Sequence, residues 1–252
     1  MKKLIMMSAV MLCGALFAEG EALTSKNIVG YTSTEVKGGK YYLIASQFQN
    51  TDGNPIKLSN FVTFGKPGEQ GREYCTDEDS AMLQVWSGDN YDTYYFLKED
   101  IDGEPNVWSS DMVFKALDVE VNLGIGVFLR AKVDDSITVA GQVASDSAMD
   151  VPVEPGSYNL IANPYPMSFD LNDTSRVDFK GCLTPSMGDD APTILVWNEE
   201  DYKSFYYIQE DCWSTDYATK SEDSEILPNR GFFLKYNVGG KEDLVHFFVR
   251  QN

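Results

Sequence analysis

The sequence predicts an all-β protein built from two tandem copies of one unit, each a β-sandwich or barrel-like module. Three observations predict this class: short apolar and aromatic runs bounded by turn residues, no sustained helical period, and one internal duplication. Of the 252 residues, 43% are hydrophobic and 13% aromatic. The chain is therefore long and apolar enough to form a sizeable core.

Residues 1–18 have the layout of a secretory signal peptide. A short positive segment, Met1–Lys3, precedes the apolar run Leu4–Phe17, which is too short for a comfortable membrane span. Small residues follow this run, so we expect cleavage after Ala18 or as late as Ala22. We therefore expect a secreted chain without membrane insertion, located outside the cell or on its surface, with the periplasm as the alternative.

Four blocks of the chain occur twice, in the same order. Gly39–Ser46 returns as Gly156–Asn163, Val85–Trp86 as Val196–Trp197, Trp108 as Trp213, and Gly126–Arg130 as Gly231–Lys235. The offset between the copies shortens in steps, as expected of one unit that was duplicated and then trimmed in its loops. We therefore expect the first unit to span residues 27–145 and the second to span residues 146–252.

Within each copy the periodicity is that of strands. Turn residues such as Asp52-Gly53 and Asp102-Gly103 separate the expected strands. No stretch sustains a helical period for three turns, and residues 110–121 are the one stretch that could hold a short helix. The expected strands are Tyr41–Phe48, Met82–Trp86, Thr93–Leu97, Ile125–Val133 and Ile137–Val143 in the first copy, and Tyr158–Ala162, Thr193–Trp197, Ser204–Gln209, Gly231–Asn237 and Leu244–Val249 in the second.

Two pairs of glycines recur at matching places in the copies. Gly39 and Gly156 precede matching strands, where we expect a backbone angle that other residues resist. Gly126 and Gly231 begin a later matching strand, where we expect a crowded neighbour to approach closely. These glycines are expected to specify the module and not a ligand.

The block Tyr158–Pro166, Y-N-L-I-A-N-P-Y-P, resembles the opening of β-domains in secreted and cell-surface proteins of Gram-negative bacteria. In those domains a V-W strand and a closing G-F-F-[VL]-K strand follow, and Val196–Trp197 and Gly231–Lys235 stand in those places. The first copy fits more loosely, with Ser46-Gln47 in place of Asn-Pro. The resemblance implies an exported, modular, β-rich protein in contact with the cell surface or extracellular material. It implies no catalytic residues.

Composition argues against several classes of function. Lys plus Arg number 20 and Asp plus Glu number 39, giving a net charge of −19 at pH 7. So acidic a surface repels phosphate backbones and anionic lipids, which disfavours nucleic-acid and membrane partners. His246 is the single histidine and lies in an apolar C-terminal run, so Ser-His catalysis and multi-histidine metal sites are disfavoured.

Aromatic residues supply the candidate ligand-binding positions. Flat rings suit the apolar faces of sugars, and Trp86, Trp197, Tyr94 and Tyr206 are the candidates for such a platform. The alternative is that these rings pack in the core between sheets.

Carboxylates and cysteines suggest two further sites. Asp100, Asp102 and Glu104 alternate around a glycine turn, and hard oxygen ligands of this kind suit Ca²⁺, although such acidic runs are usually solvated loops. Calcium is the only cofactor that the sequence suggests. Cys182 and Cys212 are the preferred disulfide pair in an oxidising compartment, and buried, unpaired thiols are the alternative.

The sequence therefore favours an exported, non-enzymatic β-module protein with a structural or adhesive role at the cell surface or in extracellular material. Its expected partner is an extracellular polysaccharide or a cell-surface component, with self-association as a further option. The first alternative is a carbohydrate-binding module that uses exposed aromatic rings. The second is a carboxylate-dependent glycoside hydrolase, although no Asp or Glu lies in a motif that singles it out.

Overall fold

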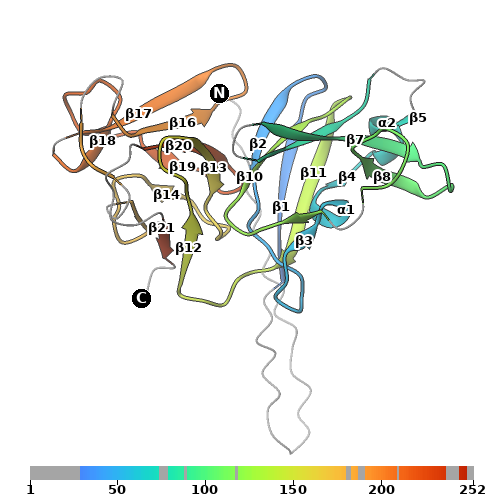
Figure 1. Cartoon of the computed structure of the whole chain (residues 1–252), viewed down its shortest axis with the longest axis horizontal. Coiled ribbons are helices and arrows are strands. Elements are labelled where there is room, and N and C mark those ends of the chain that lie inside the picture. Colours follow the sequence, from blue (N-terminus) through green and yellow to red (C-terminus); the bar gives the residue numbers. More distant parts are fainter. Residues whose placement is uncertain are drawn as a thin grey trace, which may run out of the picture.

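The computed structural model describes residues 29–73, 79–87, 90–116, 119–179, 183–186, 191–208, 210–236 and 244–248. In this part of the chain, strands dominate and the helices are single turns. The expected all-β class is confirmed, because several small, mostly antiparallel sheets account for the fold. Figure 1 shows two lobes side by side, one from the earlier and one from the later part of the chain.

Three sheets form the first lobe. A three-stranded sheet has the order β1-β11-β4, a larger sheet has the order β2-β10-β6-β7-β5 with β8 paired to β7, and β3 pairs with β9. The bounds are β1 (Val29–Val36), β2 (Tyr41–Ala45), β3 (Ile56–Lys57), α1 (Leu58–Phe61), β4 (Thr63–Phe64), α2 (Pro67–Gln70), β5 (Arg72–Glu73), β6 (Met82–Trp86), β7 (Tyr91–Glu99), β8 (Pro105–Ser109), β9 (Glu120–Val121), β10 (Gly126–Arg130) and β11 (Asp135–Gln142).

The second lobe repeats this topology strand for strand. Its sheets have the orders β12-β21-β15, β13-β20-β16-β17-β18 and β14-β19, which match those of the first lobe apart from β5. The bounds are β12 (Ala148–Pro152), β13 (Tyr158–Ala162), β14 (Phe169–Asp170), β15 (Val177–Asp178), β16 (Thr193–Trp197), β17 (Tyr202–Ile208), β18 (Cys212–Ser214), β19 (Glu225–Ile226), β20 (Gly231–Lys235) and β21 (Leu244–Phe248). The order in which the strands pair is thus the same in the two lobes, apart from β5.

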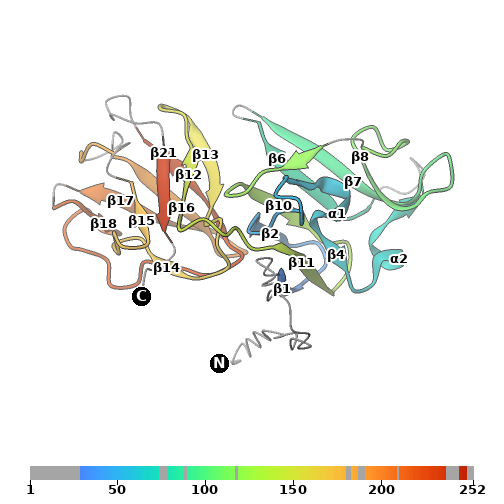
Figure 2. The same cartoon turned by 90° about the horizontal axis from the view of Figure 1, so that it is seen from below.

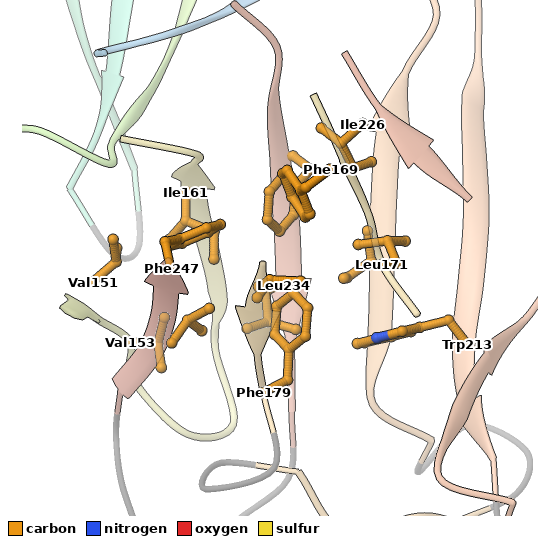
Figure 3. Packing of buried hydrophobic residues seen from close by; sticks show 14 of the residues in the cluster. Val151, Val153, Ile161, Phe169, Leu171, Phe179, Trp213, Ile226, Leu234 and Phe247 are labelled. Carbon is orange, nitrogen blue, oxygen red and sulfur yellow. The ribbon is translucent and has the colours of Figure 1, made fainter. Parts of the chain in front are cut away.

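Each lobe has its own apolar core between its small and its large sheet. Strand alternation supplies it: in β11, Ile137 and Val139 are buried, while Thr138 between them is partly exposed. Trp108 and Trp213 occupy equivalent central places in the two cores and are each 1% exposed. Figure 3 shows Trp213 in the second core near Leu171 and Phe179, with Phe169 farther along the same core beside Ile226.

A third apolar cluster joins the two large sheets to each other. Leu43 and Phe128 come from the first unit, and Leu160 and Phe233 come from the second. The four larger sheets therefore lie in sequence with an apolar layer between neighbours, in an arrangement like the blades of a four-bladed propeller. Figure 2 shows the same two lobes from below, meeting near β13 and β2.

Several local expectations can be compared with the structure. The short helix expected within residues 110–121 is wrong: the described part of this stretch consists of bends followed by β9, and the helical turns α1 and α2 lie earlier in the chain. Met112 explains this, because its φ of 65° is left-handed and interrupts a right-handed helix, while Oδ1 of Asp111 accepts the N–H groups of Val113 and Phe114 in a local turn. Strands β1 and β12 had not been expected; they are half-exposed and carry a weak apolar pattern.

The expectation for the paired turn glycines is confirmed. Gly39 and Gly156 have φ of 76° and 79°, a left-handed conformation that residues with a Cβ adopt only with strain. Each stands just before the first strand of a large sheet, β2 or β13. None of the helices in the described part of the chain is long and apolar enough to cross a membrane.

Candidate functional site

Six aromatic side chains line the junction between the two units, and we call them the aromatic seam. They flank the third apolar cluster and come from matching places: the starts of β2 and β13, and the ends of the β6–β7 and β16–β17 hairpins that face the junction. The members are Tyr41, Trp86, Tyr91, Tyr158, Trp197 and Tyr202.

The two tryptophans of the seam make reciprocal hydrogen bonds across the junction. The indole Nε1–H of Trp86 donates to the carbonyl oxygen of Tyr158 at 2.7 Å, and that of Trp197 donates to the carbonyl oxygen of Tyr41 at 2.8 Å. Each indole therefore anchors its hairpin to the first large-sheet strand of the other unit. Two identical partners related by a two-fold axis would make the same pair of reciprocal hydrogen bonds.

The ring contacts repeat in the same reciprocal way. Each hairpin pairs its own tryptophan and tyrosine at a centroid distance of 4.8 Å, and the two phenylalanines of the cluster meet at 6.0 Å on the junction. The matched pairs are Tyr91–Phe128 at 5.9 Å and Tyr202–Phe233 at 6.0 Å, Trp86–Phe233 at 6.3 Å and Trp197–Phe128 at 6.5 Å, and Tyr41–Phe128 at 6.4 Å and Tyr158–Phe233 at 6.0 Å.

Backbone approaches backbone at the centre of the junction. A Cβ placed on Gly231 would lie 3.1 Å from the Cα of Gly126, its counterpart in the other unit. Ile125 and Ile161 form a bridge between the units, and the N–H of Ala162 donates to the carbonyl of Gly124 at 2.7 Å. The crowded neighbour expected beside these glycines thus belongs to the other unit: Leu160 of β13 beside Gly126, and Gly126 and Leu43 beside Gly231.

Three tyrosines of the seam are exposed, and its other three residues are half-buried. Tyr91, Tyr158 and Tyr202 are 36%, 40% and 41% exposed. The pKa of Tyr91 is raised to about 12, mainly because its hydroxyl is partly buried and secondly because Tyr202 lies nearby. Partial burial also raises the pKa of Tyr202. Both hydroxyl groups are therefore uncharged at neutral pH, able to donate and to accept hydrogen bonds.

Charged groups of both signs surround the exposed rings. Lys235 Nζ lies 5.6 Å from the ring centroid of Tyr158, and Lys40 Nζ lies 3.8 Å from a carboxylate oxygen of Glu200. The two hairpins carry matching backbone hydrogen bonds: the N–H of Ser87 donates to the carbonyl of Asn90 at 2.9 Å, and the N–H of Asn198 donates to the carbonyl of Asp201 at 3.0 Å. The seam thus has polar flanks and is held on short, regular hairpins.

The other two expected platform residues lie apart from the seam and are not equivalent to each other. Tyr94 pairs with Leu83 and packs on the first core, and the matching residue of the second unit is the buried Phe205. Tyr206 lies on the opposite face, where its ring stacks on Tyr217 at 3.9 Å and 19°.

The expected calcium ligands serve as local structural groups. Asp100 is 4% exposed, and its Oδ1 accepts the N–H groups of Asp102 and Glu104, which closes the β7–β8 turn. Glu104 forms an ion pair with Lys115 at 3.0 Å. Within the described ranges, no group of three His, Cys, Asp or Glu side chains lies close enough together to hold a metal ion. Calcium binding stays a prediction.

The cysteine and histidine expectations are only partly described. Cys212, in β18, is buried with a free thiol, whereas Cys182 lies outside the described residues. The disulfide therefore stays a prediction. His246, in β21, contacts Asp150 of the neighbouring strand β12 through its Nδ1 at 2.6 Å.

The hollows of the second unit lie away from the seam. One of about 20 Å³ beside Trp213 has room for about one water molecule. A wider, open depression of about 590 Å³ lies over the loops near β14, and it is lined by Asp170, Asn172, Asp173, Lys220, Ser221 and Glu222.

Four seam residues were not among the sequence candidates: Tyr41, Tyr91, Tyr158 and Tyr202. Two signals in the sequence could have identified them. Each position holds a tyrosine in both copies. In β7, Tyr91 lies on the face opposite to that of the core residue Phe96, because successive side chains alternate between the two faces of a strand. An aromatic residue kept in both copies on the non-core face indicates a surface that meets something other than the unit's own core.

The chain was compared with known proteins, and no family model, no curated protein and no solved structure matches it.

Proposed function

We propose that this chain is an exported, non-enzymatic β-module protein with a structural or adhesive role at the cell surface or in extracellular material. In this proposal each unit is a small β-sandwich, formed by its three-stranded sheet and its large sheet. The N-terminal segment 1–18 supplies the export signal and is removed, with cleavage as late as residue 22.

The observation that carries the proposal is the reciprocal junction between the units. Trp86 and Trp197 each bond to the other unit, and Gly126 and Gly231 bring the two backbones together. Two modules joined in this way act as one rigid body and not as beads on a linker, because the junction combines an apolar layer with directed hydrogen bonds. Rigid, repeated β-modules suit a load-bearing or spacing role.

Charge supports the extracellular part of the proposal. A net charge of −19 keeps the chain from condensing on anionic polymers and lipids, so retention at a surface must come from specific contacts. The exposed tyrosines of the seam are the side chains best placed to make them, since Tyr and Trp dominate specific recognition surfaces.

Cell fractionation tests the proposal directly. The full chain is followed in the cells that produce it, with N-terminal sequencing of the recovered protein and protease treatment of intact cells. We expect the mature protein to begin at residue 19 or 23. We expect to recover it in the medium or on the cell surface, and we expect the recovered protein to bind isolated envelopes. Recovery in the cytosol with Met1 intact would overturn export.

Turnover assays test the non-enzymatic part. The mature protein is incubated with a panel of polysaccharides, and reducing ends are counted. We expect no release above the rate of a heat-denatured sample. Release that is abolished by changing one carboxylate would instead establish the glycoside hydrolase alternative.

A further inference from the structure

We propose that the aromatic seam is a binding site for an uncharged glycan chain, which lies along the junction with one sugar ring against Tyr91 and another against Tyr202. This inference rests on the proposed adhesive function and names the class of ligand through which the protein adheres. It assigns the site to both units together, since neither unit alone contains both rings.

The first argument is that the rings of Tyr91 and Tyr202 are not stacked in parallel on their neighbours. Tyr91 meets Trp86 at an interplanar angle of 63° and Phe128 at 73°, and Tyr202 meets Phe233 at 66°. Tilted neighbours hold a ring in place without covering it face to face. With 36% and 41% of the two residues exposed, flat apolar surface remains for a sugar ring to stack on.

The contrast with a stacked pair outside the seam is direct. Tyr206 and Tyr217 lie nearly parallel at 3.9 Å, so each covers one face of the other. That pair resembles a closed structural contact, whereas Tyr91 and Tyr202 meet their ring neighbours at steep angles and are 36% and 41% exposed. The structure therefore favours the seam over Tyr206 as the platform.

The second argument concerns charge. The chain repels polyanions, and the rim of the seam carries Lys40, Lys235 and Glu200, which together offer both donors and acceptors. Sugar hydroxyl groups donate and accept in equal measure, and the uncharged hydroxyls of Tyr91 and Tyr202 can bond to them. A neutral polyhydroxylated chain fits this rim better than an anionic one.

The third argument concerns the repeated geometry. The two halves of the seam make the same contacts in reciprocal order, so they present equivalent ring surfaces on one rigid body. A polymer of identical sugars can occupy both at once, and the second contact is then intramolecular. A monosaccharide engages one half only and binds far more weakly.

A second copy of this chain is a less suitable occupant. The aliphatic residues beneath the rings, Leu43 and Leu160, are 0% and 4% exposed, so what remains is a narrow line of tyrosines. A stable protein interface needs about 800 Å² per partner with an apolar centre. Dimerisation through the seam is nevertheless a distinct outcome of the test below.

The experiment uses the mature full chain and hexasaccharides of β-1,4-linked glucose, xylose, mannose and N-acetylglucosamine, with alginate as the anionic comparison. Binding is measured by calorimetry and by tryptophan fluorescence, since Trp86 and Trp197 lie in the seam. The variants are Tyr91→Leu and Tyr202→Leu, which keep an apolar contact with the phenylalanines but remove the flat ring. Tyr31→Leu is the matched control, because Tyr31 is 54% exposed on β1 outside the seam.

We expect at least one neutral hexasaccharide to bind and alginate not to bind. Each seam variant should weaken binding about tenfold and the double variant should abolish it, while Tyr31→Leu binds as the parent does. Thermal unfolding identifies any variant that has lost its fold, in which case the other single leucine variant carries the test.

Three results would overturn the inference: no neutral glycan bound by the parent, binding that both leucine variants retain, or self-association that the leucine variants abolish. Retention of the parent on cell envelopes is measured in the same series. Retention without glycan binding refutes the seam assignment but leaves the adhesive function standing, whereas loss of both refutes the proposed function as well.

Discussion

Replacing Gly231 by alanine should loosen the junction between the two units. The new Cβ would lie 3.1 Å from the Cα of Gly126 and 3.1 Å from Cγ of Leu43. Both separations are shorter than ordinary van der Waals contact, and the Gly126 atom is backbone, which cannot rotate away. The two units must therefore move apart by a few tenths of an ångström, which stretches the indole hydrogen bonds of Trp86 and Trp197 as well.

Overpacking of this kind lowers the free energy of unfolding by about 1–3 kcal/mol. For a chain of this size the midpoint of thermal unfolding should fall by about 2–10 °C. Gly126→Ala should lower it less, because the atoms that its Cβ would meet first, at 3.0 Å, belong to the Leu160 side chain. Gly68→Ala is the control, since nothing lies within 4 Å of its added Cβ.

Urea unfolding followed by tryptophan fluorescence measures the effect, since Trp86 and Trp197 report the junction while Trp108 and Trp213 report the cores. A Gly231→Ala protein that is as stable as the parent, within 0.5 kcal/mol, would contradict the close approach of the two units. So would an equal loss in Gly68→Ala.

The remaining predictions concern the junction, the loops and the buried thiol. Trp86→Phe and Trp197→Phe each leave a carbonyl of the other unit without its indole donor, so each should lower the free energy of unfolding by about 1 kcal/mol in urea titrations; a large effect in only one of them would contradict the two-fold equivalence. Hydrogen bonds from backbone N–H groups and a serine hydroxyl hold the pKa values of Asp111 and Asp216 below the usual 3.8. The stability that these carboxylates add is therefore present above about pH 4 and lost as the pH falls through their lowered pKa values; Asp111→Asn and Asp216→Asn should flatten the acid limb of a stability-versus-pH curve, and an unchanged limb would refute this. Burial raises the pKa of the Cys212 thiol, so its alkylation at pH 8 in the native protein should be slower than in urea, as peptide mass spectrometry can show.

Much of the secondary structure could be predicted because strand periodicity is a local property. The expected strands Met82–Trp86, Tyr158–Ala162 and Thr193–Trp197 coincide with β6, β13 and β16. Strand β1 was missed because its residues Val29–Val36 alternate between exposed and half-exposed positions, with one buried residue at the end. An edge strand with so little burial carries a weak apolar signal.

The candidate site was predicted only in part. Trp86 and Trp197 were singled out as candidate aromatic positions, but their role in joining the units was not apparent. Tyr94 and Tyr206 were treated as comparable, yet one lies on the core side of its sheet and the other on the opposite side. A one-residue difference along a strand reverses the face, so the register, and not the composition, decides which rings are available.

By itself, the sequence determined that the protein is all-β, that four blocks of residues recur in the same order, and that Gly39 and Gly156 turn the chain at matching corners. These features depend on neighbours close along the chain, namely alternation, turn residues and repeated blocks. Only the tertiary structure decided that the second face of each large sheet packs against the other unit, bringing Tyr91 and Tyr202 into one seam. The reason is physical: each strand has two faces, the unit's own core covers one, and what covers the other depends on contacts between residues more than a hundred positions apart, such as Trp197 with Tyr41.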